Sequence, residues 1–554
     1  MNNIDAIAEK VEHREKQLQE LFKKDEDNYN LWMGKEQKFD THPMAVNITG
    51  TEMTALSLKV QSSLVRSRLD IRVLPPEGHP NPEAERQANQ EERMYYFGLN
   101  KADERLGFLG ESPLLPTIAW QAVNLGRTAL LALVYEEDGE VIWHIQPLYP
   151  RFFIFEYDSK GLAWGCYETF RSPAAIKAEY GKEVPEDLVG KGVSVRDYWD
   201  RQHNVRYITK GKEKLGKTWK HPFGEVPIIF QPVSRSPRAV TNEGVDVTLW
   251  GESIFDHVSG PFKKLNEMRS IAATHAHLIA KAPLDVTYDG DAPDITEEHF
   301  NYHPSAVFKH PASVKISSME IRDIPQSLAA MMADLKAGID RATFTELNPD
   351  SPGHSGSALR ILGQDKKDVM SPRMQTMNTT CTRLCRMLKR QITVQGLEIP
   401  VRTVVNESYN VYNINPELLD NDFYVSAELV TQDVYDEVES LQRAQMYQQN
   451  RWKSRESIME QILLETDTPT EIDKMDTEDV ESAIPELKLK KVIMSYMKRG
   501  MEDEAKMATE QLAMLLIEKQ QMLQHSMQPQ GEPEGPPREP PGGQPMRPPM
   551  RGQV

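Results

Sequence analysis

The sequence predicts an α+β protein in which helices predominate, and three features lead to this prediction. Short runs of aromatic and β-branched residues, separated by turn pairs such as Asp138-Gly139, indicate a strand-rich region that ends near residue 235. Beyond residue 250, apolar residues recur at intervals of three and four, which is the spacing of amphipathic helices. The last segment, Pro529 to Val554, is more than half proline and glycine, so we expect it to be disordered.

The first 250 residues are predicted to begin with helices and to continue with strands. Apolar residues at helical spacing predict an amphipathic first helix at residues 4–22. Three more helices are expected at 49–68, 83–97 and 111–124. Six strands should follow: Thr128–Tyr135, Val141–Gln146, Phe152–Tyr157, Ala163–Phe170, Arg196–Thr209 and Val226–Phe230. Because Asp138-Gly139 and Lys160-Gly161 separate the first four strands, we expect these four to form a meander.

The region from residue 251 to 392 combines long helices with a small β module. A helix that Pro261 kinks or restarts is expected to end at Pro283, and from Pro261 to Lys281 it would be ~30 Å long. A β-like module is expected at 284–322. Asp323 and Pro325 then open a second helix. One face of this helix carries Leu328, Met331, Met332, Leu335 and Ile339.

The remaining sequence is predicted to be mostly helical. A Pro/Gly/Ser loop at 348–356 precedes a long helix at 357–392, and Pro372 should kink that helix. Further helices are expected at 434–463 and 485–526. In the last helix one apolar stripe is expected, made of Met501, Ala505, Ala508, Leu512, Leu515 and Met522.

Composition and charge limit the classes of function. The formal net charge is −18, whereas a protein that grips duplex DNA by its phosphates is normally basic. If this protein meets DNA, it should therefore not hold the DNA tightly. Three cysteines are too few for a disulfide framework and fit a reducing compartment. The polar N-terminus is not a signal peptide, and the longest apolar run, Ala129–Tyr135, is too short for a membrane span, so we expect a cytosolic origin.

One string matches a nucleotide-binding motif letter by letter. Gly211–Thr218 fits the phosphate-binding loop G-x-x-x-x-G-K-[ST], in which Lys217 and Thr218 would contact phosphate and Mg²⁺. That mechanism requires a helix directly after the loop, because the helix N-terminus holds the phosphate. Here Pro222 and Gly224 follow, and then another predicted strand. We therefore favour a lysine-rich hairpin loop over a nucleotide site.

Two other strings match motifs only in part. Asp285 to Gly290 resembles the start of a calcium loop, but position twelve is Thr296 in place of a glutamate. Gly353 to Ser357 resembles a nucleophile elbow, but its last glycine is replaced and no strand leads into it. Cys381 and Cys385 form at most half of a zinc site. The sequence therefore predicts no catalytic residue, no metal and no cofactor.

Three strings in this chain resemble one protein family. After a flexible loop, Ser355-Gly-Ser-Ala-Leu-Arg360 opens a long helix. Upstream, Gly251-Glu-Ser-Ile-Phe-Asp256 enters a helix that ends at Lys281-Ala-Pro283, and His221-Pro-Phe-Gly224 leads to Pro227-Ile-Ile229. Together with the order of elements, they resemble the portal, or head-to-tail connecting, proteins of tailed bacteriophages. The likeness covers about a quarter of the chain, and the chain looks most like portals of short-tailed phages.

The resemblance implies a portal fold with an α/β wing, two stem helices, a small β-containing clip, a long kinked wing helix and a helical crown or barrel. In chain order these parts would be: N-terminal helices and wing, 1–250; first stem helix, 251–281; clip, 282–323; second stem helix, 324–345; tunnel loop, 346–357; long helix and rest of the wing, 358–480; crown or barrel, 481–526; disordered tail, 527–554.

The resemblance also implies site residues for a ring that conducts DNA. The tunnel loop would turn these residues to DNA: Asn348, Asp350, Ser351, His354 and Ser355. The clip would present acidic residues to the motor and later to the tail: Asp289, Asp291, Asp294, Glu297 and Glu298. Stem packing would use Phe262, Leu265, Leu328, Met331, Met332 and Leu335. Repeated around a ring, the acidic residues would build a strong negative field.

The partners implied by the resemblance are those of a virion vertex. They are other copies of the chain in a ring of about twelve, double-stranded DNA without sequence specificity, the large terminase, the major capsid and scaffolding proteins, and a tail adaptor. No membrane is implied, and assembly would take place in the host cytoplasm.

Two other hypotheses compete with the portal. One is a packaging ATPase that uses Lys217 and Thr218. The other is a different phage structural protein, such as a capsid, tail-tube or adaptor subunit. Such proteins are usually shorter or β-dominated, and they lack a clip between two long helices.

Overall fold

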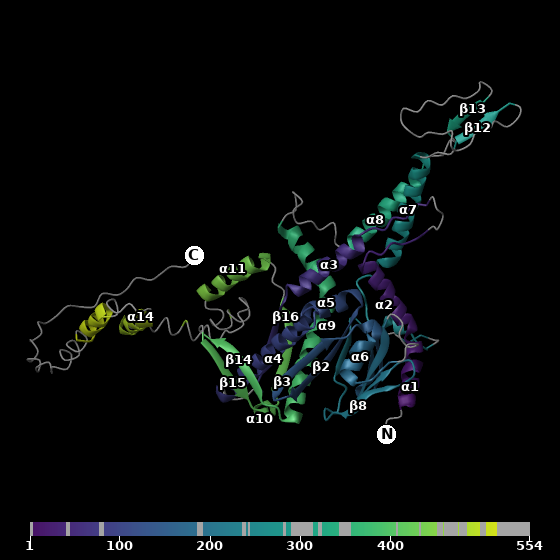
Figure 1. Cartoon of the computed structure of the whole chain (residues 1–554). Coiled ribbons are helices and arrows are strands. Elements are labelled where there is room, and N and C mark those ends of the chain that lie inside the picture. The colour runs from purple at the N-terminus through teal and green to yellow at the C-terminus, as the bar shows by residue number, and fades with distance from the viewer. Residues whose placement is uncertain are drawn as a thin grey trace, which may run out of the picture. The chain divides into compact units, whose positions relative to one another are not determined.

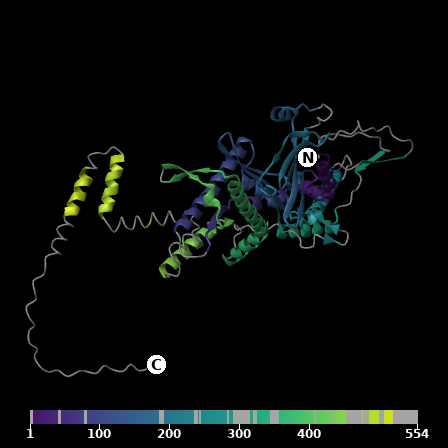
Figure 2. The same cartoon turned by 90° about the horizontal axis from the view of Figure 1, so that it is seen from below.

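The computed structural model describes most of the chain, which forms two compact units, Met1–Gln432 and Asp433–Val554. The described residues are 4–39, 45–76, 82–184, 192–234, 240–241, 244–280, 284–289, 314–318, 324–342, 356–405, 408–430, 434–450, 458, 475, 485–498 and 506–517. Helices and strands are mixed, and helical residues outnumber strand residues, which is compatible with the predicted α+β class. Figure 1 and Figure 2 show the elements from two sides.

The N-terminal region begins with helices, as predicted, but the first of them is divided. The helix expected at 4–22 is in fact two helices, α1 (Ile4–Gln17) and α2 (Gln19–Trp32). Leu18 at their junction is buried in a core cluster that contains apolar residues of both helices. The next three expected helices are α3 (Glu52–Val65), α4 (Pro82–Phe108) and α5 (Leu114–Asn124).

A three-stranded antiparallel sheet lies at the centre of the first unit. Its strand order is β3 (Glu140–Pro147), β2 (Arg127–Glu137), β9 (Ile228–Pro232). The first eight residues of β2 are all buried, because α5 and a later helix pack against this strand. Asp138 and Gly139 both have positive φ angles, 52° and 81°, which form the two-residue turn of a tight hairpin. The hairpin predicted at this pair is confirmed.

A second, five-stranded sheet follows in the order β4-β5-β6-β7-β8. Its strands are β4 (Phe153–Asp158), β5 (Gly161–Arg171), β6 (Val193–Asp200), β7 (His203–Ile208) and β8 (Lys214–Lys220), and α6 (Pro173–Tyr180) follows β5. The predicted four-strand meander is wrong, because β3 and β4 belong to different sheets. The strand predicted at 196–209 is also wrong, since Asp200 accepts hydrogen bonds from the amides of Gln202 and His203 and turns the chain there.

Strands from distant parts of the chain complete the first unit. β1 (Arg68–Leu74) pairs antiparallel with β16 (Tyr424–Val430) over seven residue pairs. Two shorter ribbons are β10 (Val240–Thr241) with β11 (Gly244–Val245), and β14 (Ile399–Val405) with β15 (Ser408–Ile414). A short helix, α10 (Pro416–Leu419), precedes β16. Four of these strands were not predicted from the sequence: β1, β14, β15 and β16.

The long helix α9 (Gly356–Gln395) packs against both β2 and β16. Pro372 lies inside it, where the sequence places the expected kink, and the helix continues to Gln395 without interruption. Cys381 and Cys385 are buried on its inner face, and burial raises the pKa of Cys381 to about 12. A thiol with so high a pKa is poorly suited to act as a thiolate ligand.

Helix α4 covers the outer edge of β1, and helix α9 covers the outer edge of β16. Their side chains bond to backbone groups at every second strand residue. The bonds run from the amides of Ile71 to Tyr96 (2.8 Å), Val73 to Glu92 (2.7 Å), Ala427 to Thr382 (2.9 Å) and Leu429 to Asn378 (2.8 Å). Two strand residues advance ~6.7 Å and four helix residues ~6 Å, so the two spacings match. The two helices therefore satisfy these four edge amides, which another strand could otherwise pair with.

The second unit is helical where the structure describes it. It contains α11 (Val434–Asn450), α14 (Pro485–Lys498) and a helix over residues 506–517. In the last helix Ala508 is buried, and Leu512 and Leu515 are less exposed than their neighbours, as the predicted stripe requires. The other predicted members of that stripe lie outside the described residues, as does the tail at 527–554. The boundary at Gln432 falls within 358–480, the part expected as long helix and wing.

Candidate functional site

The candidate site is a pair of helices that a β-hairpin connects. These elements are α7 (Ser259–Ala280), β12 (Leu284–Tyr288), β13 (Val314–Ser318) and α8 (Gln326–Ala342). Helices α7 and α8 contact each other, and β12 pairs antiparallel with β13 (Figure 1). Ile339 near the end of α8 is buried in the same core cluster as Phe262 at the start of α7, so the two helices run antiparallel. The predicted β-like module between two helices is present.

The turn that leads into α7 explains the string 251–256. Gly251 has a φ of 108°, and a Cβ there would lie 2.1 Å from the carbonyl oxygen of Gly126, so only glycine fits. Ser253 Oγ donates to the carbonyl of Asn124 at 2.8 Å. Asp256 accepts from Lys24 Nζ at 2.7 Å. The string therefore anchors the helix pair to the first unit.

Helix α7 begins later than predicted. The first stem helix was expected from residue 251, but residues 251–258 form the anchoring turn and α7 starts at Ser259. Pro261 lies in the first turn of the helix, where its missing N–H is not needed. Of the two effects predicted for Pro261, a kink or a new start of the helix, the structure shows the start.

A buried ion pair lies beneath this turn. Arg127 and Asp25 are both fully buried and in direct contact, and Arg127 also donates to the carbonyl of Trp250 at 3.4 Å. Burial raises the pKa of Asp25, although the charge of Arg127 opposes that shift. The pair ties α2 to β2 at the root of α7, and removing one partner would leave the other charge buried.

An extended segment, which we name the strap (residues 45–50), lies along α7. Its amides donate to one row of α7 side chains: Val46 to Thr274 (2.9 Å), Ile48 to Ser270 (2.9 Å) and Gly50 to Asn266 (3.1 Å). The strap advances by two residues for every four of the helix, as at the β1–β16 edges. Sequence reasoning missed the strap, although polar residues at 266, 270 and 274 on an apolar helix were a signal for it.

At the end of the strap, one carboxylate connects to both stem helices. Glu52 pairs with Arg269 of α7 at 2.7 Å. Burial alone would raise the pKa of Glu52, but the hydrogen bond and charge of Arg269, a backbone hydrogen bond and the charge of Lys336 on α8 outweigh it and lower the pKa. The strap, α7 and α8 therefore form one electrostatically linked group.

The predicted stem-packing residues divide into two groups. Phe262 and Leu265 are buried in the core, and Met332 and Leu335 are partly buried against it. Leu328 is half-buried, and Met331 is 48% exposed. Met331 is therefore not on the inner face of α8. That face is formed by residues at helical spacing, Leu328, Met332, Leu335 and Ile339.

The exposed residues of α8 include several small and apolar ones, together with the charged Asp334 and Lys336. Ala329, Ala330 and Ala333 are exposed beside Met331. On α7, Ile271 and Ile279 are 52% and 46% exposed. The helix pair thus leaves apolar surface uncovered on the far side of each helix.

The predicted clip and tunnel residues are mostly beyond the described parts of the chain. Asp289 is exposed directly after β12. The other clip residues, Asp291, Asp294, Glu297 and Glu298, lie outside the described residues. So do the tunnel-loop residues, Asn348, Asp350, Ser351, His354 and Ser355. The string that resembles a calcium loop begins on strand β12, whereas a calcium loop would have to turn there.

The phosphate-loop string lies on a hairpin. Gly211 and Lys212 have positive φ angles in the turn after β7, and Lys214–Lys220 form β8. Within residues 192–234, all of which are described, no helix follows Thr218. The amide groups of a helix N-terminus, which phosphate binding requires, are therefore missing from this string, as the hairpin interpretation predicts.

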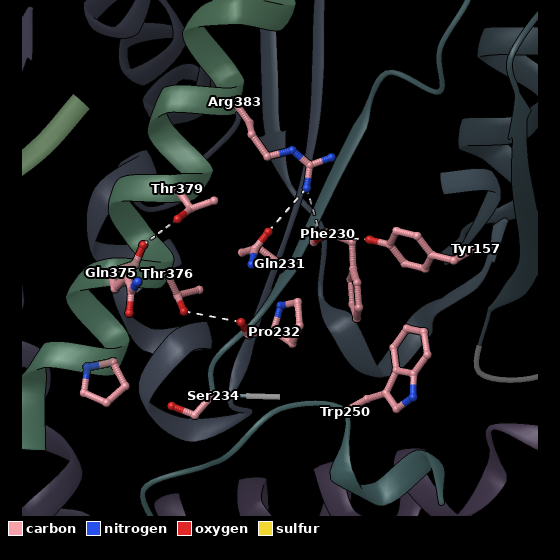
Figure 3. Close-up of a pocket in the computed structure, with 11 residues that line it drawn as sticks. Tyr157, Phe230, Gln231, Pro232, Ser234, Trp250, Gln375, Thr376, Thr379 and Arg383 are labelled. Carbon is pink, nitrogen blue, oxygen red and sulfur yellow. Dashed lines mark hydrogen bonds between the residues drawn. The ribbon is translucent and has the colours of Figure 1, made fainter. Parts of the chain in front are cut away.

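A cavity of about 480 Å³ lies between α9 and the outer edge of β9 (Figure 3). Arg383 donates from α9 to the carbonyl of Phe230 at 3.5 Å, and Tyr157 donates to the same oxygen at 2.9 Å. Thr376 donates to the carbonyl of Pro232 at 3.4 Å. These polar side chains thus bond to backbone carbonyls at the edge of β9. They satisfy the strand edge and do not form a ligand site.

Neither a metal cluster nor a membrane span occurs in the described parts of the chain. No three His, Cys, Asp or Glu side chains there are placed to hold a metal ion, and none of the helices there is both long and apolar enough to span a bilayer. No family model and no curated protein matches this chain.

Proposed function

We propose that this chain is a portal subunit, which forms a ring at a phage capsid vertex and conducts double-stranded DNA into and out of the head. The observation that carries the proposal is the α7–hairpin–α8 unit with an uncovered apolar face. The terminase motor, the tail adaptor, and the capsid and scaffolding proteins would be its partners. The chain would act as a structural conduit in the virion and not as an enzyme.

The outer face of α8 supports ring formation. Ala329, Ala330 and Ala333 are small, so another helix can approach closely, and Met331 can fill the remaining space. The three exposed alanines lie on one side of α8, bordered by Asp334 and Lys336, where a fully solvated helix usually carries longer polar side chains. In a ring each subunit has two neighbours, so α7 and α8 must each offer a face to another copy. Ile271 and Ile279 provide that face on α7.

The negative charge of the chain supports a channel through which DNA slides, and not a protein that binds DNA tightly. The net charge of −18 would repel phosphates at long range, so DNA could slide without being held. Asp289 is exposed directly after β12, between the two stem helices in the sequence. Repeated in a ring, it would contribute to a negative field at the hairpin end of the stem.

Negative-stain electron microscopy of the purified full-length chain tests the proposal. We expect closed rings with a central hole. Monomers at every protein concentration, or open tubes, would contradict it. A parallel ATPase assay distinguishes the portal from a packaging ATPase. ATP hydrolysis above background that is lost in Lys217→Ala would favour the ATPase.

A further inference from the structure

The outer edge of β8 is open, in contrast to other strand edges of the first unit. The edges of β1 and β16 are bonded by side chains of α4 and α9, and the edge of β9 by side chains of α9. β8 is the last strand of the five-stranded sheet. Among the described residues, no other segment bonds to its outer side. Unpaired backbone groups at such an edge are a template for another strand.

The backbone geometry identifies where a further strand could pair. Trp219 is paired with Asn204 of β7, and the amide of His221 donates to the carbonyl of Gln202 at 2.9 Å. Inward and outward positions alternate in an antiparallel ladder, so Lys220 turns its N–H and C=O away from β7. Its backbone is therefore available to a sixth strand.

The edge carries a concentration of positive charge on an acidic protein. Residues 210–220 contain a single carboxylate, Glu213, which pairs with Lys182 at 2.5 Å. The lysines of this stretch are Lys210, Lys212, Lys214, Lys217 and Lys220. Lys217 and Lys220 are exposed, and within the described residues neither forms an ion pair. The charge of this edge is therefore free to act on a partner.

An exposed tryptophan lies between these lysines. Trp219 is 37% exposed, and its ring packs edge-on against the buried ring of Trp199, with centroids 5.6 Å apart. The contact holds the exposed indole in a fixed orientation. Large, rigid aromatic side chains of this kind are typical anchors of protein interfaces.

Protection against aggregation explains only part of this arrangement. Lysines and bulges commonly protect sheet edges, and a register shift at Asn204–Arg206 opposite β8 is such an irregularity. Protection requires neither an exposed tryptophan nor several lysines along one strand. The same lysines that repel basic or apolar strands would attract an acidic one.

We propose that the outer edge of β8, at Lys217–Lys220, binds an extended acidic segment of a partner protein as a sixth strand. The partner backbone would pair with Lys220, its carboxylates would meet Lys217 and Lys220, and an apolar side chain would cover Trp219. This inference rests on the sheet alone and does not depend on the proposed ring.

Fluorescence anisotropy with a labelled peptide of four Glu-Val repeats tests this site on the full-length protein. We expect saturable binding at low salt that Lys217→Glu with Lys220→Glu weakens about tenfold or more. Both side chains are exposed, so the fold should be unaffected, and the neutral pair Lys217→Gln with Lys220→Gln should show a smaller loss in the same direction. Lys16→Glu with Lys59→Glu, the same charge change at other exposed lysines, should bind like the wild type.

Two further probes distinguish strand addition from general attraction. A peptide of the same sequence with N-methylated backbone amides cannot donate hydrogen bonds to an edge and should bind about tenfold more weakly. Equal binding of this peptide, or equal loss in the Lys16/Lys59 control, would overturn the proposal. Tighter binding of a short DNA duplex at the same lysines would assign the edge to nucleic acid and would also overturn it.

Discussion

The two ends of the α7–α8 pair differ in what covers them. At the root, Phe262 and Leu265 are buried among residues of α3, α5 and α9, and the strap satisfies the polar row of α7. In contrast, Ile279 of α7 and Met331 of α8 are about half exposed, and so is Ile271, which lies on another side of α7 beside the strap. The root is covered by its own chain, whereas no described residue covers the apolar side chains of the second group. On the proposed function, this apolar surface would contact other copies of the chain.

The largest expected effect is at the root. Phe262→Ala should lower the free energy of unfolding by ~3–5 kcal/mol, because it leaves a cavity in a close-packed core. Guanidinium denaturation followed by tryptophan fluorescence measures this loss. A loss below ~1 kcal/mol would mean that the root of α7 is not fixed by core packing.

A smaller loss is expected where the strap meets α7. Ser270→Ala removes the acceptor of the Ile48 amide and should cost ~1–2 kcal/mol. Hydrogen exchange measured by mass spectrometry should become faster in the peptide that contains residues 45–50. Thr117→Ala, which removes a hydroxyl that bonds only to the carbonyl of Pro113 before α5, is the matched control. Unchanged exchange in Ser270→Ala would show that the strap is held by something else.

A still smaller, pH-dependent effect is expected at the ion pair between Glu52 and Arg269. The pair is partly exposed, so Glu52→Gln should cost ~0.5–1 kcal/mol at pH 7. The pKa of Glu52 is lower in the folded protein than in the unfolded chain, so its contribution is present above the unfolded pKa. It is lost as the pH falls through the folded pKa. The wild type and Glu52→Gln should therefore converge in stability once the pH is below the folded pKa of Glu52, and a constant difference would contradict this.

The smallest effect on the fold is expected at the exposed apolar side chains of α7 and α8. Ile271→Ser should change the stability of the isolated subunit by no more than ~0.5 kcal/mol, because about half of the side chain is already exposed. The same substitution should weaken self-association, which sedimentation velocity measures over a range of concentrations. A large loss of subunit stability would place Ile271 in the core of its own chain, contrary to the comparison.

The sequence predicts local structure well and long-range contacts poorly. The Asp138-Gly139 hairpin and the helices around the β module follow from local signals of turn chemistry and spacing. The pairing of Arg68–Leu74 with Tyr424–Val430 joins segments more than three hundred residues apart. Each strand alternates apolar and polar residues, a signal that sequence reasoning overlooked, but no local pattern identifies its partner. α4 was expected to end near Gly98, but that glycine lets the helix approach the ring of Trp143, where a Cβ would lie 2.4 Å away.

The candidate site shows the same limit. Helical spacing placed Phe262, Leu265, Met332 and Leu335 on inner faces, but it could not exclude Met331 from them. Residues 331 and 332 are neighbours in sequence, and only the crossing of α7 and α8 decides which of them faces inward. The strap depends on contacts between residues more than two hundred positions apart, which no local pattern shows.

Mass measurement of the assembled particle tests the central claim most directly. The wild-type chain should form a closed particle of about twelve times the subunit mass of 63.2 kDa. Ala333→Glu places a charge on the exposed face of α8, so it should remain a subunit of 63.2 kDa with an unchanged circular dichroism spectrum. A wild-type chain that stays monomeric at all concentrations, or an Ala333→Glu particle of wild-type size, would contradict the account.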